Sequence, residues 1–102
     1  MNEVEFRKWL DDKGKKKKVI SDTISRLKRI ERELDHCDLD ELYRNDRCEW
    51  VLAAFEKMGN NEKMQQFPNT KLPIGKYYMS TYRYCLKLYV QFCNQTIISE
   101  HE

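Results

Sequence analysis

The chain has 102 residues and a formal net charge of +2. This length suits one ordinary domain with a single modest core, so residues 1–102 are expected to form one domain. No stretch approaches the ~18 apolar residues that span a bilayer. The composition therefore excludes an integral membrane protein and a chain with two sizeable cores.

Charge is unevenly distributed along the chain. Residues 7–32 hold eleven Lys or Arg and four Asp or Glu, a net charge of +7. Residues 33–62 hold three Lys or Arg and nine Asp or Glu, a net charge of −6. Residues 63–102 hold five Lys or Arg and two Asp or Glu, a net charge of +3. A polyanion responds to charges within roughly a Debye length of about 10 Å. The local asymmetry therefore says more about partners than the total does.

Residues 3–12, EVEFRKWLDD, predict a short first helix. Phe6, Trp9 and Leu10 share one face of it, and the acids of its first turn suit the helix dipole. Gly14 is expected to end this helix. The lysines from 15 to 18 then form a connection or the first turn of the next helix.

Residues 19–34, VISDTISRLKRIEREL, predict a second helix from about Val19 or Ser21 to Asp35. Apolar residues recur at steps of 4, 3, 3 and 4 from Ile20 to Leu34, which places them on one stripe. The other faces carry Arg26, Lys28, Arg29 and Arg32. One element is thus expected both to anchor the core and to present a cationic surface.

The acidic middle of the chain predicts two small helices. Asp38 followed by Glu41 resembles a capping box that starts a brief helix. Asp46 with Glu49 repeats the pattern ahead of RCEWVLAAFEKM, an apolar segment that Gly59 is expected to end. The acidic surplus fits either the exposed side of these helices or a partner surface.

Residues 59–75 predict a long loop that holds Phe67, Leu72 and Ile74 against the core. Residues 76–95 predict the last and longest helix, and residues 96–102 a frayed tail or linker. The expected buried stripe of this helix is Tyr78, Tyr82, Cys85, Tyr89, Phe92 and Cys93. With no hairpin pattern and no repeat, the predicted fold class is all-α, a compact bundle of four to five helices.

The four cysteines, at 37, 48, 85 and 93, are too widely spaced for a CxxC pair and are expected to be reduced thiols in a cytoplasmic protein. A zinc site with His36 is the alternative, but structural zinc sites usually take two ligands from one tight turn. The acids around Asp38 are better explained by helix capping than by magnesium. No metal and no cofactor are predicted.

Motifs of catalysis are missing from the sequence. It holds no glycine-rich phosphate loop, no GxSxG elbow, no HExxH and no paired His/Cys nucleophile. We therefore expect that this chain is not an enzyme.

The order of the predicted segments resembles the SAM-like core-binding domain at the N-terminus of phage integrases and other tyrosine recombinases. Ser21 to Ile30 stand where that family has a second helix of the form S-x-x-T-I-x-x-x-L-x-x-I. Ser80 to Phe92 stand where it has a last helix of the form S-T-x-x-x-x-L-x-x-Y-x-x-F. The resemblance covers most of the chain. A similar helical module also precedes the nuclease domains of restriction-type enzymes.

The resemblance implies binding of double-stranded DNA without catalysis, because a recombinase's catalytic domain would follow this segment and would hold the nucleophilic tyrosine. In the family, the second and last helices face the duplex from two sides of a C-shaped clamp. Carried over by position, the DNA-binding residues are Lys15, Lys16, Lys17, Lys18, Ser25, Arg26, Arg29 and Arg32 on the first surface, and Lys76, Ser80, Arg83 and Lys87 on the second. These two sets are expected to converge on one concave side.

Two other classes of function remain open alternatives. The acidic segment 35–62 could mimic phosphate charge in a protein-interaction module such as a phage-type regulator, which would bind a basic partner and not DNA. The helix stripes could instead continue across a symmetric dimer. The sequence fixes neither the oligomeric state nor the DNA site.

Overall fold

The computed structural model describes the backbone of residues 1–101 and the side chains of residues 1–96. This part of the chain contains five α-helices, two short 3-10 helices and no strand, so the predicted all-α bundle is confirmed. The elements are α1 (Glu3–Asp12), α2 (Lys17–Glu33), α3 (Leu39–Asp46), α4 (Glu49–Ala54), η1 (Glu56–Gly59), η2 (Met64–Gln66) and α5 (Met79–His101). The expected frayed tail falls mostly on residues 97–102, whose side chains lie outside the described part.

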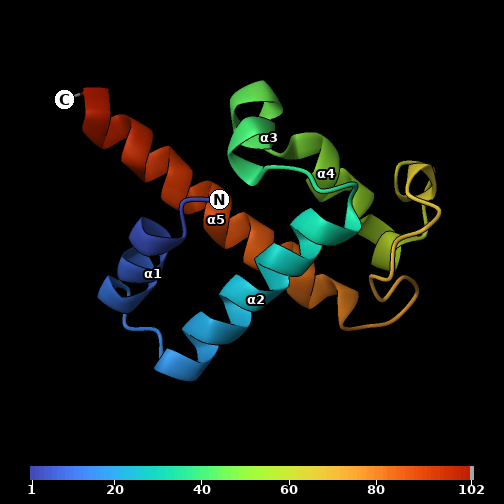
Figure 1. Cartoon of the computed structure of the whole chain (residues 1–102), viewed down its shortest axis with the longest axis horizontal. Helices are drawn as coiled ribbons and strands as arrows, with labels where there is room; N and C mark the ends of the chain where they lie inside the picture. Colours follow the sequence, from blue (N-terminus) through green and yellow to red (C-terminus); the bar gives the residue numbers. More distant parts are fainter. Residues whose placement is uncertain (102) are drawn as a thin grey trace.

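Helix α5 is the axis on which the other helices pack. It runs diagonally through the molecule, with α1 on one side, α3 and α4 on the other, and α2 crossing it (Figure 1). Phe6 of α1 meets Tyr89 of α5 edge to face, with ring centroids 5.0 Å apart. Leu27 and Ile30 of α2 are completely buried. The stripes predicted for α1 and α2 therefore form the core. None of the helices in the described residues is long and apolar enough to cross a bilayer.

The start of α3 is fixed by carboxylates from two helices. The Asp38 carboxylate accepts a hydrogen bond from the Asp40 N–H at 3.1 Å, so Asp38 is the expected N-cap. Glu31 of α2 accepts the Leu39 N–H at 3.1 Å, so a carboxylate from another helix satisfies a second donor at this helix start. The cap thus also joins α3 to α2.

Helix α4 is shorter than predicted. It ends at Ala54 instead of reaching Gly59, because Lys57 and Met58 adopt left-handed backbone conformations with φ of 54° and 57°. The side-chain amide of Asn61 donates to the carbonyl oxygens of Ala54 and Glu56, both at 2.9 Å. These bonds satisfy carbonyl groups that the helix would otherwise leave without donors.

The buried stripe of the last helix was predicted correctly except at its start. Tyr78 is 44% exposed, because it lies in the turn before the helix, and Met79 is fully buried in its place. In the preceding loop Leu72 is buried as expected and Phe67 packs against Trp50, but Ile74 is exposed. The structure thus corrects the positions of Tyr78 and Ile74.

Gly59 should tolerate substitution worse than Gly14. Both have left-handed backbone angles, φ of 83° and 82°, which cost a non-glycine residue roughly 1–2 kcal/mol. A Cβ on Gly59 would also lie 3.3 Å from side-chain carbons of Ile74 and Met79, whereas none lies within 4 Å at Gly14. Urea denaturation should give a lower free energy of unfolding for Gly59→Ala than for Gly14→Ala. Equal values would contradict the tight contact.

Candidate nucleic-acid interface

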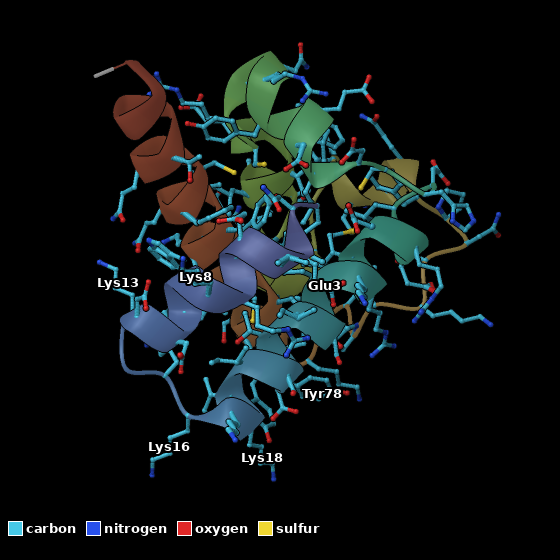
Figure 2. The ribbon with its side chains drawn as sticks, turned by 60° about the vertical axis from the view of Figure 1, so that its left-hand side comes forward. Glu3, Lys8, Lys13, Lys16, Lys18 and Tyr78 are labelled. Carbon is cyan, nitrogen blue, oxygen red and sulfur yellow. The ribbon has the colours of Figure 1, made fainter. Side chains whose placement is uncertain are left out.

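The lysine run lies at the connection between α1 and α2. The left-handed Gly14 lets the chain turn, and the Lys15 N–H donates back to the Leu10 carbonyl at 3.1 Å. Lys16 is the N-cap of α2 and provides no side-chain cap. Lys16, Lys17 and Lys18 are exposed and Lys15 is half-buried. Figure 2 shows Lys16 and Lys18 extending from the lower end of the molecule.

This placement is electrostatically unfavourable for the isolated helix. The N-terminus of a helix carries a partial positive charge that favours acids, yet α2 has no acid in its first turn and begins with lysines. Among residues 1–96, no ion pair joins any of the four lysines from 15 to 18 to a carboxylate. The positive potential at this end of α2 is therefore available to an anionic partner.

The arginines of α2 are mostly held by other parts of the fold. Arg29 donates to the Tyr82 hydroxyl at 2.8 Å and to the Lys71 carbonyl at 2.7 Å, which ties the long loop and α5 to α2. Arg26 interacts with the thiol of Cys85. Arg32 is exposed beside Glu33, at 3.6 Å, and Ser25 is exposed.

The second predicted set lies on a different side of α5. The Nε of Arg83 donates to the Leu52 carbonyl at 3.2 Å, and its Nη2 is 3.8 Å from the Glu56 carboxylate. Cys85, two residues later, faces Arg26 of α2. Residues two apart on a helix point about 200° apart, so Arg83 and Lys87 point away from α2. The structure does not bring the two predicted cationic sets together on one side.

The remaining members of the second set are exposed. Lys76 lies before α5 and Ser80 in its first turn, where the Ser80 hydroxyl donates to the Tyr77 carbonyl at 3.0 Å. Lys87 is exposed in the middle of the helix.

Three carboxylates surround the amino group of Met1, an arrangement that the sequence analysis did not predict. The nitrogen lies 3.2 Å from Asp38, 3.4 Å from Glu31 and 3.5 Å from Asp40. Tyr89 of α5 bridges this cluster to α1, since its hydroxyl donates to Asp40 and accepts the Asn2 N–H at 2.7 Å. The cluster is formed by segments that are far apart in the sequence, so no local sequence pattern predicts it.

Stability should fall with pH as the Met1 amino group loses its proton. Burial lowers its pKa, but attraction by Glu31 and Asp40 and the hydrogen bond to Asp38 raise the pKa overall above its ordinary value of 8.0. A raised folded-state pKa contributes stability that is complete below pH 8.0 and is lost as pH rises through the folded value. In a chain that begins with a free Met1 amino group, unfolding free energies should decline above that pH.

The matched control for this pH dependence is the same chain acetylated at its N-terminus. Acetylation removes the charge, so the loss of stability just above pH 8.0 should be smaller in the acetylated chain. Parallel pH profiles for the two chains would contradict a role of the carboxylates in binding this amino group.

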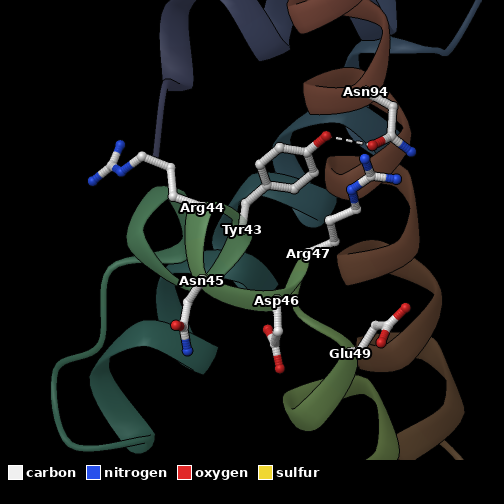
Figure 3. A pocket seen from close by; sticks show the side chains of 7 residues that line it. All are labelled: Tyr43, Arg44, Asn45, Asp46, Arg47, Glu49 and Asn94. Atoms are coloured by element: carbon white, nitrogen blue, oxygen red, sulfur yellow. Dashed lines mark hydrogen bonds between the residues drawn. The ribbon is translucent and has the colours of Figure 1, made fainter.

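The acidic segment is interrupted by cations. Tyr43, Arg44, Asn45, Asp46, Arg47, Glu49 and Asn94 line an open pocket between α3, α4 and α5 (Figure 3). In it, the Tyr43 hydroxyl donates to Asn94, and the Arg47 side chain extends toward the same amide. Two arginines alternate here with two carboxylates, so the pocket has mixed charge.

The cysteines have the character of core residues. All four thiols are free, and burial raises the pKa of Cys37 to about 11 and that of Cys48 to about 12. Such thiols are almost entirely protonated at neutral pH. No group of three or more His, Cys, Asp or Glu side chains in the described residues is arranged to hold a metal ion.

Comparison of the chain with protein-family models, with curated proteins and with solved structures finds no match.

Proposed function

We propose that this chain binds duplex DNA without catalysing a reaction, through the lysine-rich start of α2. The observation that carries the proposal is the run from Lys15 to Lys18, which lies at the positive end of a 17-residue helix and has no carboxylate partner among the described residues. No contact within the fold accounts for these four charges. A row of phosphates would balance them.

The mechanism is that of a polyelectrolyte contact. Lysines that neutralise phosphates release condensed counterions, so the affinity falls steeply with salt and depends little on sequence. Ser25 and Arg32, exposed further along α2, extend the same contact. In this proposal the other two arginines of α2 stabilise the fold and do not bind DNA. Arg29 is bound to Tyr82 and Lys71, and Arg26 lies against Cys85.

The resemblance to recombinase core-binding domains gives the proposal a setting. In that setting the chain is a non-catalytic module of site-specific recombination, with catalysis supplied by a separate domain. The resemblance implies a clamp with two DNA-binding surfaces. The proposal keeps only the surface on α2, since Arg83 and Lys87 point away from α2.

A phosphate-mimicking surface on residues 35–62 is less well supported. Three carboxylates of the chain, two of them from this segment, surround the Met1 amino group, and Glu56 is near Arg83. The Asp46 carboxylate accepts the Trp50 N–H at 3.0 Å at the start of α4. Arg44 and Arg47 line the same pocket as Asp46 and Glu49. The segment therefore lacks a continuous row of free negative charge.

Fluorescence anisotropy with a labelled blunt duplex tests the proposal. Binding that weakens steeply between about 50 and 200 mM salt, for duplexes of unrelated sequence, is expected. No binding at the lower salt concentration would overturn the proposed function.

A further inference from the structure

Three of the six tyrosines are exposed near the start of α5, and they are called the aromatic patch below. Tyr77, Tyr78 and Tyr84 are 83%, 44% and 52% exposed. The rings of Tyr77 and Tyr78 meet edge to face, with centroids 5.5 Å apart and planes at 86°. This aromatic patch presents flat apolar surface to water at the end of the longest helix.

The buried tyrosines serve the fold in a way that the aromatic patch does not. Tyr43 donates to Asn94, Tyr89 donates to Asp40, and Tyr82 accepts from Arg29. Within residues 1–96, no hydrogen bond from the hydroxyls of Tyr77, Tyr78 and Tyr84 joins another residue. Packing and hydrogen bonding therefore do not explain why these rings stand at the surface.

The aromatic patch continues into a stripe without negative charge. Ser80, Tyr84, Lys87 and Gln91 follow one another at steps of 4, 3 and 4 along α5, and all four are exposed. The sequence from Lys76 to Ser99 contains no Asp or Glu. Lys76 and Lys87 have no ion pair among the described residues. Rings and unpaired lysines on a helix face that carries no acid of its own complement a flexible polyanion with flat apolar groups, although Glu56 of η1 lies beside Arg83 at the border of this face.

Tyr78 of the aromatic patch and the lysine run both lie on the lower side of the molecule (Figure 2). Figure 2 places Tyr78 at the lower end, where Lys16 and Lys18 extend. In Figure 1, the starts of α2 and α5 both lie in the lower half of the molecule, α2 at the left and α5 at the right. One nucleic acid would therefore have to extend across this lower side, from the start of α2 to the start of α5, to reach both the lysine run and the rings (Figure 1).

We propose that Tyr77, Tyr78 and Tyr84 stack on unpaired bases of a DNA strand that continues from the duplex bound by Lys15 to Lys18. The inference rests on the proposed function and specifies its substrate class as duplex DNA with a single-stranded extension. Unpaired bases are required because the faces of paired bases are covered by their neighbours in the duplex. Stacking on aromatic side chains accepts any base, since every base has a flat π-face.

The experiment compares three labelled DNAs that share one duplex. The first is blunt, the second has an overhang of about eight thymines, and the third has an overhang of abasic sites with the same phosphates. The thymine overhang should raise the affinity at least about fivefold, the effect of one stacked base. The abasic overhang should add much less, because it offers charge without rings.

Variants then assign the preference to the aromatic patch. The double variant Tyr77→Ser with Tyr84→Ser should lose the thymine preference and keep binding of the blunt duplex, while Tyr77→Phe with Tyr84→Phe should keep both. Circular dichroism checks that the variants fold, as expected for side chains that are more than half exposed.

The outcomes separate this inference from the proposed function. Equal affinity for blunt and thymine-tailed duplex, or a preference that survives the serine substitutions, overturns the inference and leaves duplex binding in place. If the abasic overhang raises the affinity as much as the thymine overhang does, the protein contacts only the phosphates of the overhang. That result also overturns the proposed stacking. Failure to bind any of the three DNAs overturns both.

Discussion

Replacing the lysines from 15 to 18 with alanine should weaken binding of duplex DNA of every sequence and flatten its dependence on salt. Each phosphate contact contributes about −0.9 to the slope of log affinity against log salt. Loss of four contacts should therefore reduce that slope by roughly three to four. Anisotropy titrations of the wild type and the variant across a salt series measure this difference.

The same substitutions should not harm the fold. Alanine has the highest helix propensity, and removal of cations from the first turn of α2 relieves their repulsion by the helix dipole. The variant is thus expected to be at least as stable as the wild type while it binds DNA less well. Opposite effects on stability and binding would distinguish a lost contact from a damaged structure.

Two control variants test whether the position or only the amount of charge matters. Arginine at 15 to 18 keeps the charge and should keep the salt slope. Alanine at Lys63 and Lys71 removes charge from the long loop and should change the slope little. If these loop substitutions weaken binding as much per charge as those at the start of α2, the lysine run is not the binding surface.

Local pattern was enough to predict the elements that build the core. The stripe from Ile20 to Leu34 and the face of Phe6 and Leu10 are buried as the helical spacing indicates. These predictions succeed because neighbours within one helix decide which face is apolar. The capping role of Asp38 is local for the same reason.

Several helix ends could not be read from the sequence. Left-handed pairs of non-glycine residues form the corners at Asp35 and His36, Arg47 and Cys48, and Lys57 and Met58. Glycine is the usual indication of such conformations, and these three corners carry none at the paired positions. The early end of α4 was missed because the Lys57 conformation and the Asn61 side-chain cap depend on the folded loop.

The binding partners of the cations also required the structure. In the sequence, Arg29, Arg32 and Arg83 look alike, as basic residues on the polar side of a helix. The fold uses Arg29 to hold Tyr82 and places Arg83 beside Glu56, while Arg32 stays largely exposed. Tertiary contacts, not helical periodicity, thus decide which charges remain without a partner inside the fold.

Replacing Phe6 with alanine should cause a large loss of stability. The Phe6 side chain is fully buried, and its ring lies 5.0 Å from that of Tyr89 and 5.4 Å from that of Phe92. Truncation of a buried phenylalanine costs about 3–5 kcal/mol, and an ordinary domain has only about 5–15 kcal/mol in total. Urea denaturation should therefore show a much lower midpoint for Phe6→Ala.

The matched control is Val4→Ala on the same helix. Val4 is 77% exposed, so its truncation should change the free energy of unfolding by no more than about 0.5 kcal/mol. The contrast tests the packing of α1 on α5, because both changes shorten an apolar side chain of α1 but only one removes contacts with Tyr89 and Phe92. Similar stabilities for the two variants would mean that α1 does not pack on α5 through Phe6.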